Sequence, residues 1–365
     1  MTIDKLIKFR TDLHQIPELG HEEFKTQEYI LNELEGLDCK IDKVGTGVVA
    51  YFDTGGEKTI AFRCDMDALP ITEETNLSFK SLHVGKMHAC GHDGHMSMVI
   101  GLAHYISENK KDINKNIVLI FQPSEERDAG ANVIIDSGLL QGYNTSAIFG
   151  MHLWPMLEKG RVFSRAGEFM AGASEIDITV HGEATHIANT GEGINAMQIG
   201  AKLILAINEL DESIPDDKYS FIRFGKMQSG VAGNILSAKT EFFGSLRTFD
   251  ADMKLEIKDK LESIVTSLEK EYNTKINIEY RDGYDPVINN KALLDGLIDK
   301  GMPVIVLDKP SMTAEDFGLY AKIAPINFFF LGLGETPALH NEKFDFDMEV
   351  LESGFEFFKR IIEKY

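Results

Sequence analysis

Residues 59–126 read TIAFRCDMDALP at 59–70, HMSMVIGLAHYISENK at 95–110 and NIVLIFQPSEE at 116–126. The first and third segments are short runs rich in Ile, Val and Phe, which is typical of strands buried on both faces of a sheet. The middle segment places its apolar residues at helical spacing. A strand, a helix and a second strand in succession favour an α/β domain.

Further strands are predicted on both sides of this pattern, in VGTGVVAYF (44–52) and SAIFGMHLWP (146–155). Apolar α/β character returns after about Asp285, in MPVIVLD (302–308) and PINFFFLGLG (325–334). We therefore expect a domain made of residues 1–171 and 285–365, with a mixed sheet and helices on both of its faces.

The pattern differs between residues 172 and 284. EIDITVHG (175–182) alternates like a half-buried strand, and GINAMQIGAKLILAINEL (193–210) is an amphipathic helix. Two strands, a second amphipathic helix and a final strand follow, which completes the order β-α-β-β-α-β. That order is associated with ferredoxin-like α+β sandwiches. We expect residues 172–284 to form a smaller domain inserted into the larger one.

Composition limits the class of function. The chain of 365 residues is too long for one compact core, and its 37 Lys and Arg against 58 Asp and Glu give a net charge of −21. Such a surface repels nucleic acid phosphates and anionic membranes, so we exclude both as partners. The charged N-terminus is unlike a signal peptide, and three cysteines without framework spacing favour the cytoplasm.

The densest cluster of chemically active side chains is MHACGHDGHM (87–96). It holds five residues of metal-ligand type, His88, Cys90, His92, Asp93 and His95. His and Cys at alternate positions can face one ion from a turn. The alternative is a helix N-terminus with scattered polar residues, but five such residues in one run favour metal binding.

Other candidate ligands follow separate predicted strands: Asp65, Asp67, Glu125, Glu126, His152 and His340. Each has a simpler explanation taken alone, because paired glutamates are often solvated and a lone histidine is usually structural. In open α/β sheets, however, ligands bind outside the carboxyl ends of the strands. Residues distant in sequence are therefore expected to converge there.

Nitrogen, oxygen and thiolate ligands suit Zn²⁺ or a similar ion such as Mn²⁺, Co²⁺ or Ni²⁺. The candidates are too many for one tetrahedral ion, which favours two. Two ions can polarise a carbonyl and activate water, while a free carboxylate transfers the proton. The sequence contains no G-x-S-x-G elbow, Walker loop or G-x-G-x-x-G after a strand, so serine-nucleophile and nucleotide chemistry are unsupported.

These residues resemble the aminoacylase and carboxypeptidase-G type two-metal amidohydrolases, in the branch of hippurate hydrolases, auxin-conjugate hydrolases and N-acetyldiaminopimelate deacetylases. The resemblance covers nearly the whole chain. It rests on LHQIPELGHEE (13–23), RCDMDALPI (63–71), MHACGHDGHM (87–96), FQPSEE (121–126), GMHLWP (150–155), GSLRTFD (244–250), MTAEDFGLY (312–320) and ALHNEKF (338–344).

The resemblance implies a role for each matching residue. Glu125 is the general base, and Asp67 orients a metal ligand from outside the coordination sphere. The implied metal ligands are Cys90, His92, Glu126, His152 and His340.

The resemblance also implies that the inserted domain is a lid and a dimerisation domain, so that the protein is a homodimer. There His186 reaches the substrate carbonyl, often from the partner subunit, and Asn234 and Arg247 hold the substrate carboxylate. The branch usually has a motif of the form GGHAAxPH here, whereas this chain has EATHIANTG (183–191), with Thr190 and Gly191 in place of the proline and second histidine.

The expected function is metal-dependent hydrolysis of the amide bond of a small-molecule N-acyl amino acid. N-acetyl-diaminopimelate, an intermediate of lysine biosynthesis, is the first candidate by resemblance. The alternatives are a broad-range aminoacylase, a dipeptidase of the same mechanism, or a non-catalytic metal-binding protein of this fold. Glu125 argues against the last, because a protein that only binds metal needs no base.

Overall fold

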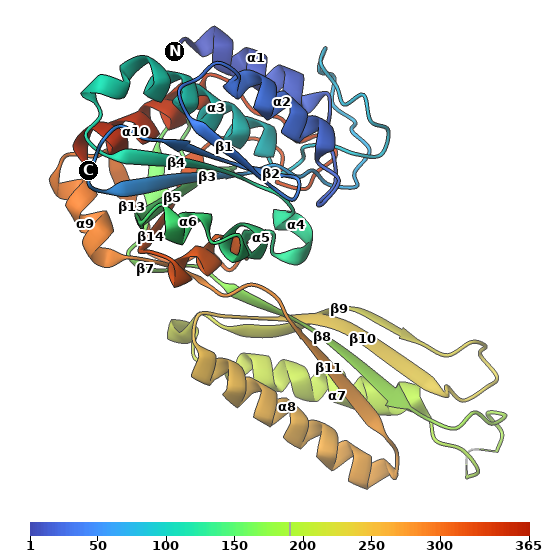
Figure 1. Ribbon diagram of the computed structural model, residues 1–365. Coiled ribbons are helices and arrows are strands. Elements are labelled where there is room, and N and C mark those ends of the chain that lie inside the picture. Colours follow the sequence, from blue (N-terminus) through green and yellow to red (C-terminus); the bar gives the residue numbers. More distant parts are fainter. Residues whose placement is uncertain (190) are drawn as a thin grey trace. The chain divides into compact units, whose positions relative to one another are not determined.

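The computed structural model describes residues 1–189 and 191–365, which form two compact units (Figure 1). Unit 1 comprises Met1–Phe169, Val287–Lys309 and Asp316–Tyr365, and unit 2 comprises Met170–Pro286 and Pro310–Glu315. Thr190, in the segment 183–191 that differs from the family motif, lies outside the described residues. No helix in the described part of the chain is both long and apolar enough to cross a membrane.

Unit 1 is built on an eight-stranded sheet. In spatial order its strands are β1 (Lys40–Val44), β2 (Gly47–Phe52), β4 (Asn116–Gln122), β3 (Thr59–Asp65), β5 (Thr145–Trp154), β14 (Ile326–Gly332), β6 (Val162–Ser164) and β13 (Val304–Val306). The central strands β4, β3, β5 and β14 run parallel, while β1 and β2 pair antiparallel at one edge. The predicted α/β domain with a mixed sheet is therefore confirmed.

Helices cover both faces of this sheet (Figure 1). One layer consists of α1 (Ile3–His14), α2 (Phe24–Leu34), α3 (His92–Asn109) and α10 (Val350–Lys364). The other contains α4 (Glu125–Asp128), α5 (Ala131–Asp136), α6 (Leu139–Gly142) and the 3₁₀ helix η3 (Asp316–Lys322). Because both faces are covered, all seven residues of β3 and of β14 are buried.

The parallel strands end at one edge of the sheet. Asp67 lies in the loop after β3, Glu125 begins α4 shortly after β4, His152 lies near the end of β5, and His340 follows β14. Parallel pairing of β3 with β4 and β5, and of β5 with β14, therefore brings these positions to the same edge.

Unit 2 has the β-α-β-β-α-β order that the sequence predicts. Its antiparallel sheet contains β11 (Ile276–Asp282), β8 (Gly172–His181), β10 (Lys239–Thr248) and β9 (Phe221–Ser229), in that spatial order. The helices α7 (Ala196–Glu212) and α8 (Ala251–Tyr272) cover one face (Figure 1). Burial alternates along β8 because only that face is packed.

The remaining elements are short connections and one further helix. They are η1 (Lys110–Asp112), β7 (Gly167–Met170), η2 (Asp216–Lys218), β12 (Val287–Asn289) and α9 (Lys291–Asp299).

Candidate metal centre

A tight turn places Cys90 and His92 beside the end of β5. Gly91, between them, has a φ of 86°, a left-handed conformation that favours glycine. A Cβ at this position would also lie only 3.1 Å from Leu153 Cδ1. His92 then begins α3, so the two candidate ligands leave the turn at the helix N-terminus.

Two groups of candidate ligands share Cys90. Cys90, His92 and His152 form one group and Cys90, Glu126 and His340 the other, with the ligand atoms of each group within 4.8 Å of one another. Cys90 Sγ lies 3.4 Å from His152 Nε2, and Glu126 Oε1 lies 3.1 Å from His340 Nε2. Such spacings fit pairs of ligands that bind one ion at about 2.0–2.3 Å. Cys90, His92 and His152 would therefore hold one ion, and Cys90, Glu126 and His340 a second.

In His92 and His152 a backbone carbonyl takes up Nδ1, which leaves Nε2 as the nitrogen that could bind a metal ion. His92 Nδ1 donates to the Asp67 carbonyl at 2.8 Å, and His152 Nδ1 donates to the Leu153 carbonyl at 2.7 Å. His92 Nε2 is buried and has no hydrogen-bond partner among the described residues. A protein usually orients a metal-binding imidazole in this way, through a hydrogen bond from the ring nitrogen that does not bind the metal.

Asp67 connects two parts of this centre. Its Oδ2 accepts the backbone N–H of Glu126 at 3.0 Å, and its Oδ1 lies 3.4 Å from His92 Nδ1. The side chain is fully buried, at 1% exposure. Asp67 therefore lies where a residue that orients His92 and Glu126 is expected, without belonging to either group of candidate ligands.

The electrostatics of the centre favour a bound cation. Burial alone would lower the pKa of His92, but the carboxylates of Asp65, Asp67 and Glu126 outweigh it and raise this pKa to about 10. Burial, together with the charges of Glu126 and Glu125, raises the pKa of the Cys90 thiol well above its usual value. A metal cation would supply the positive charge that a Cys90 thiolate needs here.

Glu125 lies beside the candidate ligands. A carboxylate oxygen of Glu125 is within 4.8 Å of the ligand atoms of His92 and Glu126, and Glu125 is 6% exposed. Ser124, just before it, adopts a left-handed conformation with φ 52°, and its N–H donates to Glu23 Oε1 at 2.9 Å. Ser124 therefore anchors the backbone at the point where Glu125 and Glu126 begin α4.

Three members of the ligand-rich run have other partners or surroundings. Asp93 accepts hydrogen bonds from Arg10 at 3.0 Å and from His14 at 2.7 Å. Burial would raise the pKa of Asp93, but Arg10 and His14 hold it well below its usual range. Burial lowers the pKa of His88 to about 3, so this ring is neutral. His95 uses both ring nitrogens, donating to Asp65 at 2.6 Å and accepting the Leu153 N–H at 2.9 Å.

Within unit 2, the three predicted substrate-binding residues do not lie together. The loops of His186 and Asn234 are adjacent, because the Ile187 N–H donates to the Asn234 carbonyl at 3.0 Å. They lie near Lys239, at the start of β10, whereas Arg247 is near its end. Arg247 lies eight positions along the extended strand from Lys239, a distance of about 27 Å. One small substrate cannot span that distance.

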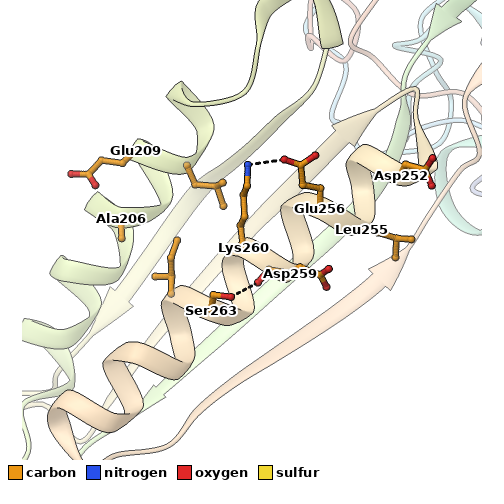
Figure 2. Close-up of a pocket in the computed structure, with 10 residues that line it drawn as sticks. Ala206, Glu209, Asp252, Leu255, Glu256, Asp259, Lys260 and Ser263 are labelled. Atoms are coloured by element: carbon orange, nitrogen blue, oxygen red, sulfur yellow. Dashed lines mark hydrogen bonds and ion pairs between the residues drawn. The ribbon is translucent and has the colours of Figure 1, made fainter.

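An open groove of about 710 Å³ lies between α7 and α8 of unit 2 (Figure 2). Its walls carry acidic side chains and Lys260, which pairs with Glu256 at 2.7 Å. None of the predicted site residues lines it. The groove is therefore a surface feature, distinct from the candidate metal centre.

Comparisons with known proteins agree with this geometry. Residues 61–364 match the model of peptidase family M20/M25/M40. The chain belongs to this family. An N-acetyldiaminopimelate deacetylase of Streptococcus thermophilus is 34% identical over 96% of each chain, and one of Leuconostoc mesenteroides is 32% identical over 99% of this chain and 97% of that protein. The crystal structure of a dinuclear metal-binding M20 peptidase of Bacillus subtilis has a TM-score of 0.84 and 28% identity, covering 100% of this chain and 99% of that one.

Membership of the M20 family confirms the resemblance seen in the sequence, and the protein is a metal-dependent amidohydrolase. The dinuclear relative and the two candidate groups that share Cys90 support two divalent ions. Asp65, a candidate ligand from the sequence, belongs to neither group that shares Cys90, although its Oδ2 lies 3.6 Å from His92 Nε2. The sequence did contain one indication that Asp65 has a buried role. Asp65 and the charged residue Arg63 lie in a strand whose other residues are mostly apolar, and the whole strand is buried.

Proposed function

We propose that the protein is a two-metal deacetylase of N-acetyl amino acids, with N-acetyl-diaminopimelate as the first candidate substrate. Glu125 beside two candidate ligand groups carries the proposal, because a base at that position has no use in a purely metal-binding protein. The substrate is suggested by several relatives, at 31–34% identity over nearly the whole chain, most of which are named for that reaction.

The chain's own residues perform the proton transfers in this proposal. Bound cations would supply Lewis acidity, polarising the amide carbonyl and lowering the pKa of the attacking water. Glu125 accepts a proton from that water as its oxygen bonds to the carbonyl carbon. The same carboxyl then returns the proton to the amide nitrogen as the C–N bond breaks, which releases the carboxylic acid and the free amino acid.

The proposed ligand roles are Cys90, His92, Glu126, His152 and His340. A shared thiolate and three imidazoles favour Zn²⁺, with Mn²⁺, Co²⁺ and Ni²⁺ as the alternatives. A cysteine with this task has to stay reduced, and the three cysteines are free in the structure, which supports a cytoplasmic location.

A hydrolysis panel tests the substrate. The metal-loaded protein is given N-acetyl-diaminopimelate, N-acetyl-methionine, hippurate and a dipeptide. We expect kcat/KM for N-acetyl-diaminopimelate to exceed kcat/KM for the other three compounds by at least ~10-fold. A site that forms hydrogen bonds with the second polar end of this substrate discriminates against substrates that lack such an end. Similar rates on the first two would indicate a broad-range aminoacylase, preference for the last a dipeptidase, and no turnover a binding protein.

We also propose that residues 172–284 form the lid and mediate a homodimer. The ~27 Å of strand between Lys239, near the His186 and Asn234 loops, and Arg247 supports this, because a partner subunit could bring its His186 and Asn234 to the substrate that Arg247 holds. Strand β9 is at an open edge of its sheet, where another strand can pair.

Sedimentation tests the dimer. The intact protein is expected to sediment as a dimer, and a variant lacking residues 172–284 as a monomer. The ends of this segment can be joined, because the Ala173 N–H donates to the Tyr284 carbonyl at 3.0 Å. A dimer that persists in the shortened variant would place the interface elsewhere.

A further inference from the structure

A chain of hydrogen bonds connects β3 to the candidate ligand His152. Arg63 Nη1 donates to Asp65 Oδ2 at 2.8 Å, and His95 Nδ1 donates to Asp65 Oδ1 at 2.6 Å. His95 Nε2 accepts the Leu153 N–H at 2.9 Å, and the carbonyl of Leu153 accepts His152 Nδ1–H at 2.7 Å. His152 Nε2, at the end of the chain, lies 3.4 Å from Cys90 Sγ.

Every side chain in this series is buried and paired. Arg63 and His95 are each 1% exposed and Asp65 is 0% exposed. Arg63 also donates to Asp316 Oδ1 at 2.9 Å and to Gln122 Oε1 at 2.8 Å, so one guanidinium lies between two carboxylates. A buried ion pair with this many satisfied hydrogen bonds holds its members in one geometry.

We propose that Asp65 and His95 are positioning residues for His152. Because Asp65 accepts from Nδ1, His95 is held as the tautomer whose Nε2 can only accept a hydrogen bond. That nitrogen fixes the Leu153 peptide, which in turn orients the imidazole of His152. The inference rests on the proposed ligand role of His152 and is independent of the substrate.

His95→Phe is the direct test, because it keeps a planar ring and removes both nitrogens. We expect one of the two metal ions to bind about 10–100-fold more weakly, the usual effect of losing a partner outside the coordination sphere. In the metal-free protein, ¹⁵N NMR of the imidazoles is expected to show that His152 loses its single Nδ1–H tautomer. His95→Gln should restore much of both properties, since its amide oxygen can accept the Leu153 N–H.

Lys115→Met is the matched control for lost stability. Lys115 is 8% exposed, donates to the Ile362 carbonyl at 2.9 Å and belongs to neither the candidate metal centre nor the hydrogen-bond chain. This variant should unfold at a lower temperature with unchanged metal affinity. Asp65→Asn is a second disruptive variant if His95→Phe does not fold, because an amide offers only one oxygen to Arg63 and His95.

The inference is overturned if the folded His95→Phe or Asp65→Asn protein melts earlier, as the control does, yet keeps both metal affinities and the wild-type His152 tautomer. A failure of the proposed function can be distinguished from a failure of this inference. A wild-type protein that binds two ions but hydrolyses no amide would refute the proposed function, while the tautomer and affinity measurements would still decide the role of His95.

Discussion

Glu125→Gln is expected to lower turnover by ~10²–10⁴-fold, as is typical when a general acid–base group is lost. Glutamine keeps the size and much of the hydrogen bonding of Glu125 but cannot accept the proton from water. Both ions should stay bound, because neither of the two groups that share Cys90 includes Glu125. Turnover and metal content are measured on the same sample.

Glu126→Gln is the matched comparison, at the neighbouring position. Glu126 Oε1 lies 3.1 Å from His340 Nε2, and both belong to a group with Cys90. This variant should bind metal more weakly, and excess metal should restore part of its activity. If Glu125→Gln loses metal while Glu126→Gln loses only rate, the two roles are reversed. If neither change affects hydrolysis, the proposed mechanism does not operate.

Cys90→Ser is expected to weaken both metal ions, because Cys90 is the one member common to the two candidate groups. The loss of affinity should exceed the ~10–100-fold that a partner outside the coordination sphere costs, since a ligand itself is removed. Metal competition assays give the affinity for each ion. In the wild-type protein, bound metal should also protect Cys90 from alkylation.

Cys39→Ser is the control for this substitution. Cys39 is half-buried and belongs to none of the candidate metal groups among the described residues. Its replacement should leave both affinities unchanged. A Cys90→Ser protein that loses only one ion would mean that the sulfur serves a single ion, and one that keeps both would remove Cys90 from the centre.

The sequence was sufficient to predict which strands deliver the candidate ligands. Parallel strands end at one edge, so Glu125, His152 and His340 could be expected to meet there even though they are far apart in the chain. The alternating apolar pattern similarly predicted the order of elements between residues 172 and 284. Both predictions succeed because the spacing of apolar residues follows directly from the backbone geometry of strands and helices.

The sequence could not assign each member of the ligand-rich run. Residues 92–95 lie in the first turn of α3, where successive side chains point in different directions around the helix axis. Asp93 therefore meets Arg10 and His14 of α1, while His95 meets Asp65. These partners come from separate parts of the chain, and nothing in the spacing of the run itself indicates them.

The predicted substrate-binding residues show a similar limit of sequence-based prediction. His186, Asn234 and Arg247 could be matched to family motifs, but the sequence does not show that β10 separates the first two from the third. That separation depends on strand length and register, in which Lys239 pairs with His181 and Arg247 with Ala173.

A metal titration of chelator-treated protein tests the two-metal amidohydrolase account most directly. Hydrolysis of N-acetyl-diaminopimelate and bound metal are measured together as Zn²⁺ or Mn²⁺ is added. We predict no hydrolysis without metal and a rate that stops rising when two ions are bound per chain. Full activity in protein that retains no metal would contradict the account.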